Sequence, residues 1–466
     1  MGDLKRNIYV AFSAQFISLL VSFLTSLVVP KVLSVANYGY WQLFIFYTNY
    51  VGFLHLGLND GIYLINGGKT RSEIDKRDIN SQFIVSLIIQ SVFAFAISFL
   101  ACRVSSESDR IFVICTAALF MVVANASSFL GYLFQAMNET RIYSFSTMVD
   151  RASFLMMLLG IIFFKVDSFQ LLIVFYLISK AFCLIYCVFN AKDFLISGLE
   201  RLSITADRTL SSIKVGCLLM LANVSDSLIL GVMQYMADGA WGIETFGSIS
   251  FAITMVNFFL TFVLQVSMVL FPALRQSSSA EQKRLYINFG KILDLFLPAV
   301  YLLCLPIIQV LSIWLPQYKN SLSYFICLIP ICVFNARMSI CNTTYFKVLR
   351  MEKSLFSINL VTVLASALLS AISIFVLNSV YCALLGAVAC IIARSIFASG
   401  ILNKRMGHQT SLCSIGTVIL TVVFVVSSIT LGNFVGFIVY LLTYSLYCFL
   451  CRKDIYFYGE RIIHRI

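Results

Sequence analysis

Long polar segments are almost absent from this 466-residue sequence. Charged residues make up only 12% of the chain, whereas hydrophobic residues make up 60%. The connections between its apolar stretches are mostly short, so the sequence leaves no room for a water-soluble catalytic domain. Such a composition is typical of a helical membrane protein, in which the backbone groups are satisfied within the helices themselves.

Histidines and metal-binding motifs are also scarce. The three histidines, His55, His408 and His464, lie far apart and show no metal-ligand spacing. The fourteen cysteines fall almost entirely within apolar stretches, where a free cysteine behaves as a small hydrophobic residue. We therefore expect neither a metal site nor a disulfide framework.

Apolar stretches that are long enough to cross a membrane recur along almost the whole chain. An apolar helix needs about 20 residues to cross the ~30 Å hydrocarbon core. The first stretch follows Lys5 and Arg6 as in a signal peptide, but it continues to Val29 without a small-residue cleavage site, so we expect it to be retained. The sequence predicts an all-α polytopic membrane protein with about 14 transmembrane helices, at residues 8–30, 41–65, 79–101, 111–135, 142–164, 169–190, 213–236, 246–271, 291–313, 322–346, 355–377, 381–402, 411–431 and 434–451.

The basic residues predict that both termini are cytoplasmic. In this orientation most lysines and arginines lie in cytoplasmic loops, which is the positive-inside pattern. These charges form short collars at helix ends, where they contact anionic headgroups of the lipid bilayer, so the net charge of +12 does not indicate nucleic acid as a partner. The opposite side carries few basic residues: Lys31, Arg103, Arg110, Lys165 and Lys319.

A polar connection at residues 191–212 divides the chain into two halves. A shift of 208 residues aligns the halves and places Asn49 on Asn257. Transporters are often built from duplicated bundles of this kind, with the substrate held where the bundles meet. We expect an N-terminal six-helix lobe (1–190), a cytoplasmic linker (191–212), a C-terminal six-helix lobe (213–403), and two additional helices with a basic tail (404–466).

Three short motifs resemble one family of transporters. They are VLSVANYGYWQLF (32–44), LGLNDGI (56–62) and QAMNETR (135–141). Together with the pattern of six, six and two helices, they resemble the polysaccharide transporters of the multidrug/oligosaccharidyl-lipid/polysaccharide exporter superfamily, O-antigen repeat-unit flippase type. The resemblance implies a multi-pass protein of the bacterial inner membrane, active in lipopolysaccharide and related polysaccharide biosynthesis.

The resemblance also implies a cargo and a mode of action. The cargo would be a polyprenyl-diphosphate-linked oligosaccharide, such as one carried on undecaprenyl diphosphate. It would be moved from the cytoplasmic to the periplasmic leaflet by alternating access, without a covalent change, and other polysaccharide-assembly membrane proteins would be further partners. On this interpretation the protein is not an enzyme.

Four cationic side chains fall inside predicted spans. A charge near the bilayer centre costs roughly 2.5–3.5 kcal/mol on insertion scales, so charges that remain there usually face protein or a water-filled cavity. Either they form a cationic cavity for the diphosphate of the cargo, which arginine can bind bidentately, or they pair with acidic neighbours or with helix-end carbonyls. Four acids are available, of which Asp150 and Asp226 lie within spans and Asp60 and Asp294 lie nearer their ends. The four residues are Arg151, Lys180, Arg337 and Arg394.

Further polar residues in the spans have two interpretations each. Asp226 is either a coupling site for H⁺ or Na⁺ or the ion-pair partner of one of the four cations. Four amide side chains either line the cleft and contact sugar hydroxyls or form hydrogen bonds between helices. They are Gln15, Asn49, Asn223 and Asn257. Apart from this possible coupling ion, we expect no cofactor.

Two other functions fit the sequence less well. A cation-coupled multidrug exporter of the same superfamily is expected to have twelve spans and to concentrate acids in its lobes. A membrane glycan polymerase or ligase needs a large external loop, but the longest external loops expected here, around 102–110 and 237–245, are short.

Overall fold

The computed structural model describes residues 16–452, except residues 277, 320 and 408–411. No strand occurs within these ranges, so the part of the chain that is described is all-helical apart from its turns and loops. The chain forms two compact units, which we call unit 1 (residues 1–227) and unit 2 (residues 228–466). Their boundary lies inside helix α10 (Leu202–Gln276), and the domain limits expected from the sequence stay a prediction.

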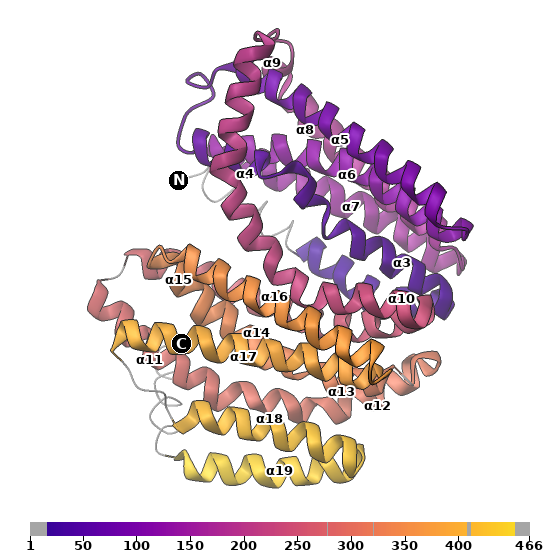
Figure 1. The fold of residues 1–466 in the computed structure, drawn as a ribbon, viewed down its shortest axis with the longest axis vertical. Coiled ribbons are helices and arrows are strands. Elements are labelled where there is room, and N and C mark those ends of the chain that lie inside the picture. Colours follow the sequence, from indigo (N-terminus) through magenta and orange to yellow (C-terminus); the bar gives the residue numbers. More distant parts are fainter. Residues whose placement is uncertain (1–15, 277, 320, 408–411, 453–466) are drawn as a thin grey trace. The chain divides into compact units, whose positions relative to one another are not determined.

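Unit 1 is a helical bundle in which α5, α6, α7 and α8 lie side by side (Figure 1). Helix α6 is central, since it packs against α3, α4, α5, α7 and α8. Its apolar face, which includes Phe129, Leu130 and Leu133, is fully buried. Besides the first part of α10, the elements of unit 1 are η1 (Leu24–Val28), α2 (Val29–Val32), α3 (Val35–Thr48), η2 (Val51–His55), α4 (Leu58–Asn66), α5 (Lys76–Val104), α6 (Ser108–Ala136), α7 (Thr140–Phe164), α8 (Phe169–Asn190) and α9 (Lys192–Leu195).

One arginine joins three connections of unit 1 that are distant in sequence. Arg71 lies between α4 and α5, and its Nε and Nη2 donate to the two carboxylate oxygens of Glu139, both at 2.9 Å. Its Nη1 lies 2.8 Å from Oδ1 of Asp193 on α9. A bidentate arginine–carboxylate pair fixes geometry as well as charge. Glu139 of the QAMNETR motif therefore anchors the turn between α6 and α7.

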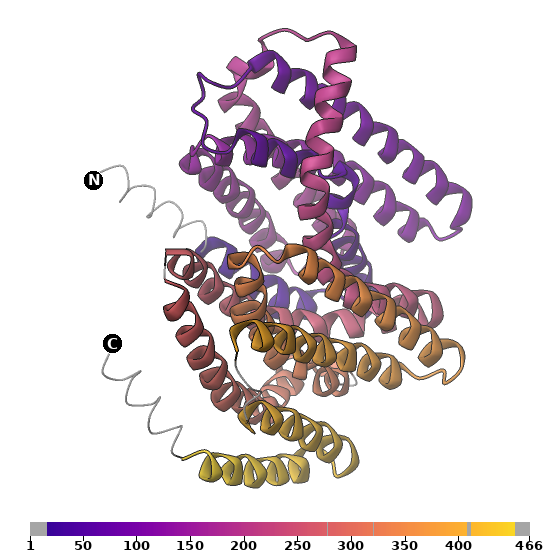
Figure 2. The same cartoon turned by 60° about the vertical axis from the view of Figure 1, so that its left-hand side comes forward.

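Unit 2 contains the rest of α10 and the helices that follow it. Helices α16 and α17 lie side by side, as do α18 and α19, and both pairs remain adjacent when the molecule is turned (Figure 2). The elements are α11 (Ser279–Phe296), η3 (Leu297–Leu303), α12 (Cys304–Trp314), η4 (Pro316–Tyr318), α13 (Leu322–Leu328), α14 (Pro330–Arg337), η5 (Met338–Thr343), α15 (Thr344–Val348), α16 (Glu352–Phe375), α17 (Val380–Met406), α18 (Leu412–Thr430) and α19 (Asn433–Leu450).

Prolines explain two of the interruptions in unit 2. Proline has no backbone N–H and clashes with the preceding turn, so it fits best in the first turn of a helix. Pro298 lies at the start of the 3₁₀ segment η3, which follows α11 directly. Pro330 begins α14 immediately after α13. At both prolines the hydrogen bonding therefore changes locally, and each stretch still counts as one candidate membrane span.

Eleven helices in the described ranges are long and apolar enough to cross a membrane. The first expected span lies partly outside these ranges, and its described part is the shorter apolar segment Phe16–Val32. The second is divided into α3, η2 and α4. The seventh and eighth run on as α10, in which only Gly242 is non-helical. The chain is thus a polytopic helical membrane protein, while fourteen spans and cytoplasmic termini stay predictions.

Candidate functional site

The second expected span is broken in its middle. Helix α3 ends at Thr48, and α4 begins only at Leu58. Between them Leu56 and Gly57 have φ angles of 56° and 88°, in the left-handed region. Glycine adopts this conformation at no steric cost, but leucine rarely does. The sequence therefore tolerates a sharp turn here only because the surrounding structure holds it.

Two buried amide side chains support this break. Backbone groups that lie free inside a membrane protein must find partners within the protein. Gln90 of α5 donates through Nε2 to the carbonyl of Leu54 at 2.6 Å. Asn125 of α6 donates through Nδ2 to the carbonyl of Val51 at 3.0 Å and to Oε1 of Gln90 at 2.8 Å. The break is thus satisfied by side chains from neighbouring helices.

A histidine and an aspartate flank the break. Nε2 of His55 lies 3.8 Å from Oδ2 of Asp60, and each side chain is only 8% exposed. The backbone N–H of Gly57 donates to Nδ1 of His55 at 3.1 Å. The sequence alone did not predict this pair as a site. Its only signal was a histidine and an aspartate within one apolar stretch, on either side of Leu-Gly-Leu-Asn.

Small residues bring α4 and the first part of α10 into backbone contact. A Cβ atom added to Gly61 would lie 2.0 Å from the carbonyl oxygen of Ser212, and one added to Gly216 would lie 2.0 Å from that of Gly57. Gly57 and Gly61 are four residues apart, as are Ser212 and Gly216. This small-xxx-small spacing is typical of helices that cross closely in membranes.

The two cations predicted in unit 1 lie on neighbouring helices. Nζ of Lys180 on α8 lies 3.2 Å from Oδ2 of Asp150 on α7. Ser179 donates through its hydroxyl to Oδ1 of the same carboxylate at 3.2 Å. Arg151 follows Asp150 on α7 and interacts with Tyr176 of α8. Lys180 therefore follows the ion-pair alternative in this structure, and its partner is Asp150.

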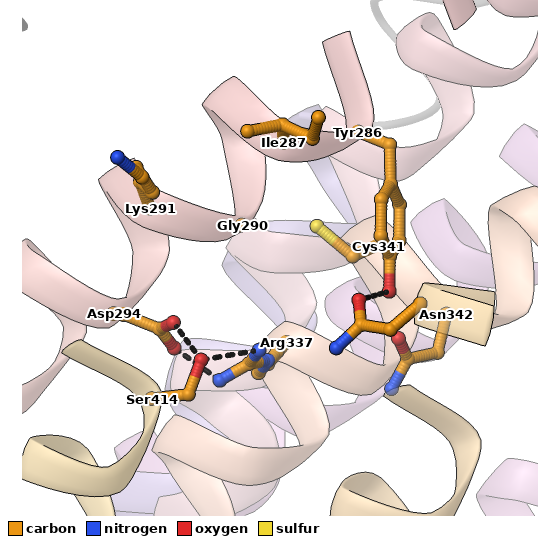
Figure 3. A pocket seen from close by; sticks show the side chains of 10 residues that line it. Tyr286, Ile287, Gly290, Lys291, Asp294, Arg337, Cys341, Asn342 and Ser414 are labelled. Carbon is orange, nitrogen blue, oxygen red and sulfur yellow. Dashed lines mark hydrogen bonds and ion pairs between the residues drawn. The ribbon is translucent and has the colours of Figure 1, made fainter. Parts of the chain in front are cut away.

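Arg337 in unit 2 also has a carboxylate partner. It lies at the end of α14 and pairs with Asp294 of α11 (Figure 3). Ser414 of α18 donates to Oδ2 of Asp294 at 2.6 Å and accepts from Nη2 of Arg337 at 3.1 Å. The adjoining cavity, lined also by Tyr286 and Asn342, measures about 20 Å³, which is room for about one water molecule. In this conformation it is too small for a diphosphate.

Arg394 has a different environment. It lies near the middle of α17 and is 3% exposed. Its Nη2 donates to Oδ1 of Asn335 on α14 at 2.9 Å, and its Nη1 donates to Oδ1 of Asn359 on α16 at 3.5 Å. These two acceptors are amide oxygens on two neighbouring helices, and they orient the guanidinium.

Four further predicted site residues lie directly after α3 or on α10. Asn49 directly follows α3, Asp226 and Asn257 lie on α10, and all three side chains are exposed. Asn223 lies on α10, but its side chain is outside the described part, and Gln15 lies outside the described residues. No group of three or more His, Cys, Asp or Glu side chains that could hold a metal occurs within the ranges described.

The sequence matches no known family model and no curated protein. Its fold, however, is similar to that of solved transporter structures. An inward-facing multidrug resistance MATE family transporter of the MOP superfamily aligns with a TM-score of 0.57 at 12% identity, over 84% of this chain and 94% of that one. The outward-facing conformation of such a transporter aligns with a TM-score of 0.54 at 11% identity, over 86% and 94%.

A third similar structure is noted for the polarity of its binding pocket. It is a MOP superfamily transporter from Pyrococcus furiosus, whose binding pocket is described as having reverse polarity that suggests a different function. It aligns with a TM-score of 0.55 at 12% identity, over 86% of this chain and 94% of that one. Identities this low establish a common fold and leave the cargo open. The chain therefore has the fold of MOP superfamily transporters.

Proposed function

We propose that the protein is a flippase that moves a polyprenyl-diphosphate-linked oligosaccharide, an O-antigen or related repeat unit, from the cytoplasmic to the periplasmic leaflet of the bacterial inner membrane. The polar headgroup would cross within the protein by alternating access while the polyprenyl tail stays in lipid. The fold supports a transporter, and the three sequence motifs support this type of cargo.

The observation that carries the proposal is the environment of Arg394. A guanidinium stays charged at any physiological pH, and a charged side chain inside a membrane protein often marks the path of a substrate or an ion. Asn335 and Asn359 hold its planar fork in one orientation. Arginine binds the oxygens of a phosphate bidentately, so an oriented and buried guanidinium suits a diphosphate better than a neutral drug.

The carboxylate pairs fit the same proposal as exchangeable partners. Lys180 and Arg337 have Asp150 and Asp294 as partners in this structure. A diphosphate would replace a carboxylate with another anion, so each cation would keep a counter-charge during transport. This exchange requires the pairs to open when the cargo binds.

A cation-coupled multidrug exporter of the same superfamily is the second candidate. Two of the similar structures are multidrug resistance MATE transporters. The buried acids Asp60, Asp150 and Asp294 could also serve such a function. The two candidates differ in cargo charge, because an anionic headgroup needs the cations whereas a cationic drug would be repelled by them.

Transport by purified protein in proteoliposomes tests the proposal. The cargo is a polyprenyl-diphosphate oligosaccharide, and flipping is followed by its accessibility to a membrane-impermeant sugar reagent. We expect wild-type protein to flip it and Arg394→Gln to lose this activity. Arg405→Gln is the matched control, because Arg405 is exposed near the end of the same helix. Normal flipping by well-folded Arg394→Gln would contradict the proposal.

A further inference from the structure

We infer that the His55–Asp60 pair at the broken second span is a proton-binding site, and that the proton binds to the carboxylate of Asp60. The assignment of this proton to the coupling of transport rests on the proposed function. The binding of the proton itself does not, since it follows from the geometry of unit 1 alone.

The hydrogen bonds of His55 determine where a proton can go. Nδ1 accepts the N–H of Gly57, and a ring nitrogen can accept only when it carries no proton. The imidazole is therefore neutral, with its proton on Nε2, the nitrogen nearest to Asp60. A further proton on His55 would break the bond to Gly57, whereas a proton on Asp60 would not. Proton uptake by Asp60 changes the charge of the pair from −1 to 0.

The surroundings of Asp60 bring opposing influences together. A buried carboxylate is costly unless it is well paired, and at 3.8 Å the imidazole is beyond normal hydrogen-bonding distance. Asp60 also lies in the first turn of α4, where the helix dipole favours an anion. Burial thus favours the protonated carboxyl group and the helix dipole favours the carboxylate, so a small structural change can add or remove the proton.

The neighbouring elements contribute few titratable groups. Tyr132 of α6 interacts electrostatically with Asp60 and with Tyr63 of α4 and Tyr143 of α7. From α10 it is the backbone around Gly216 and Cys217 that approaches the break. From α5 and α6 the groups that approach the break are the neutral amides of Gln90 and Asn125. Among the contacts described, Asp60 therefore has no lysine or arginine as a counter-charge.

A second observation indicates that this region lacks a donor. The side chain of Asn59, next to Asp60, is completely buried. Its Nδ2 donates to the carbonyl of Asn125 at 3.1 Å, but its Oδ1 has no hydrogen-bond partner among the described residues. A buried polar atom without a partner normally indicates water, an ion or a functional role. Next to Asp60 there is thus a buried acceptor that has no donor among the described residues.

The break is a feature of one half of the chain. Residues 257–274, which the shift of 208 residues aligns with 49–66, are helical throughout. In unit 1 the Gly57–Nδ1 bond fixes the left-handed turn, and Gly57 and Gly61 lie against the backbone of α10. A change of charge at Asp60 therefore acts next to a left-handed turn that the Gly57–Nδ1 bond holds and that packs against α10.

Infrared difference spectroscopy tests protonation directly. Full-length protein in phosphatidylcholine vesicles is acidified, and the C=O band of a protonated buried carboxyl group is recorded. We expect this band in wild type and its loss in Asp60→Asn. Asp207→Asn should keep the band, because Asp207 is an exposed acid near the start of α10.

A second variant separates protonation from folding. In His55→Asn the shorter side chain retains an acceptor for Gly57 but removes the imidazole that lies next to Asp60, so the band should persist at an altered frequency. An unchanged band in Asp60→Asn would overturn the inference. So would a response of the Asp60 carboxylate to Na⁺ at constant pH without any response to acid.

The link to transport is tested by imposing a pH gradient on the proteoliposomes. We expect the gradient to stimulate flipping by wild type and not by Asp60→Asn. If wild type shows the carboxyl band but flips no lipid-linked oligosaccharide, the proposed function fails and the proton site stands. If it flips the cargo without showing the band, the proton site fails and the function stands.

Discussion

Replacement of Asp294 by asparagine removes the counter-charge of Arg337 in unit 2. The side chains of Asp294 and Arg337 are 2% and 13% exposed, so bulk water has little access to the pair. Removal of one member of a buried ion pair typically costs about 3–5 kcal/mol, because the other charge stays buried. The new amide can still accept from Ser414, so that bond adds little to the loss. We expect Asp294→Asn to lower the free energy of unfolding by about 3–5 kcal/mol.

Reversible unfolding in mixed detergent micelles measures this change. The control is Asp294→Asn combined with Arg337→Gln, which removes both charges and should recover most of the stability, since neutral replacement of a whole pair is often close to neutral. A loss for the single variant of no more than about 0.5 kcal/mol, the size typical of surface substitutions, would refute the reasoning. A double variant as unstable as the single one would show that packing matters more than charge.

Two further predictions concern unit 1. Gly61→Ala should prevent α4 from approaching Ser212, because the added Cβ would lie 2.0 Å from the carbonyl oxygen of Ser212. The control is Gly160→Ala at an open helical position, which should be neutral or stabilise the protein by up to about 1 kcal/mol. The yield of monodisperse protein on size exclusion measures both, and equal yields would contradict the prediction. A hydrogen bond from Arg208 lowers the pKa of Asp75, the N-cap of α5. Because the folded pKa is the lower one, this attachment is present above the ordinary carboxyl pKa and is lost as the pH falls through the lowered value. Hydrogen–deuterium exchange at residues 202–212 should therefore rise below about pH 4 in wild type. In Arg208→Ala the exchange should be high already at neutral pH. Protection of these residues in wild type that does not change with pH would contradict the prediction.

The positions of most spans could be predicted because the bilayer imposes a fixed apolar length on them. The break at residues 49–57 could not, since Leu56 is not a residue that normally indicates a left-handed turn. Its cause is tertiary, because Gln90 and Asn125 come from helices that are distant in sequence. The expected external loop at 237–245 is likewise helical except at Gly242.

The candidate site residues could be named from sequence, but their partners could not. Charge within an apolar stretch is visible in any sequence, so Lys180, Arg337, Asp150 and Asp294 were recognisable. Which acid meets which cation depends on the rotation of each helix and on the neighbours it packs against. Asp150 is adjacent to Arg151 in sequence, yet it is Lys180 on the next helix that lies against it.

The accumulation of lipid-linked oligosaccharide in a deletion strain tests the central claim most directly. The strain lacks this protein alone, and its lipid-linked repeat unit is identified by mass and labelled in intact inner membranes with a membrane-impermeant sugar reagent. The flippase proposal predicts a single repeat unit that accumulates shielded on the cytoplasmic side. Units that accumulate but are reachable from the periplasmic side, or no accumulation at all, would contradict it.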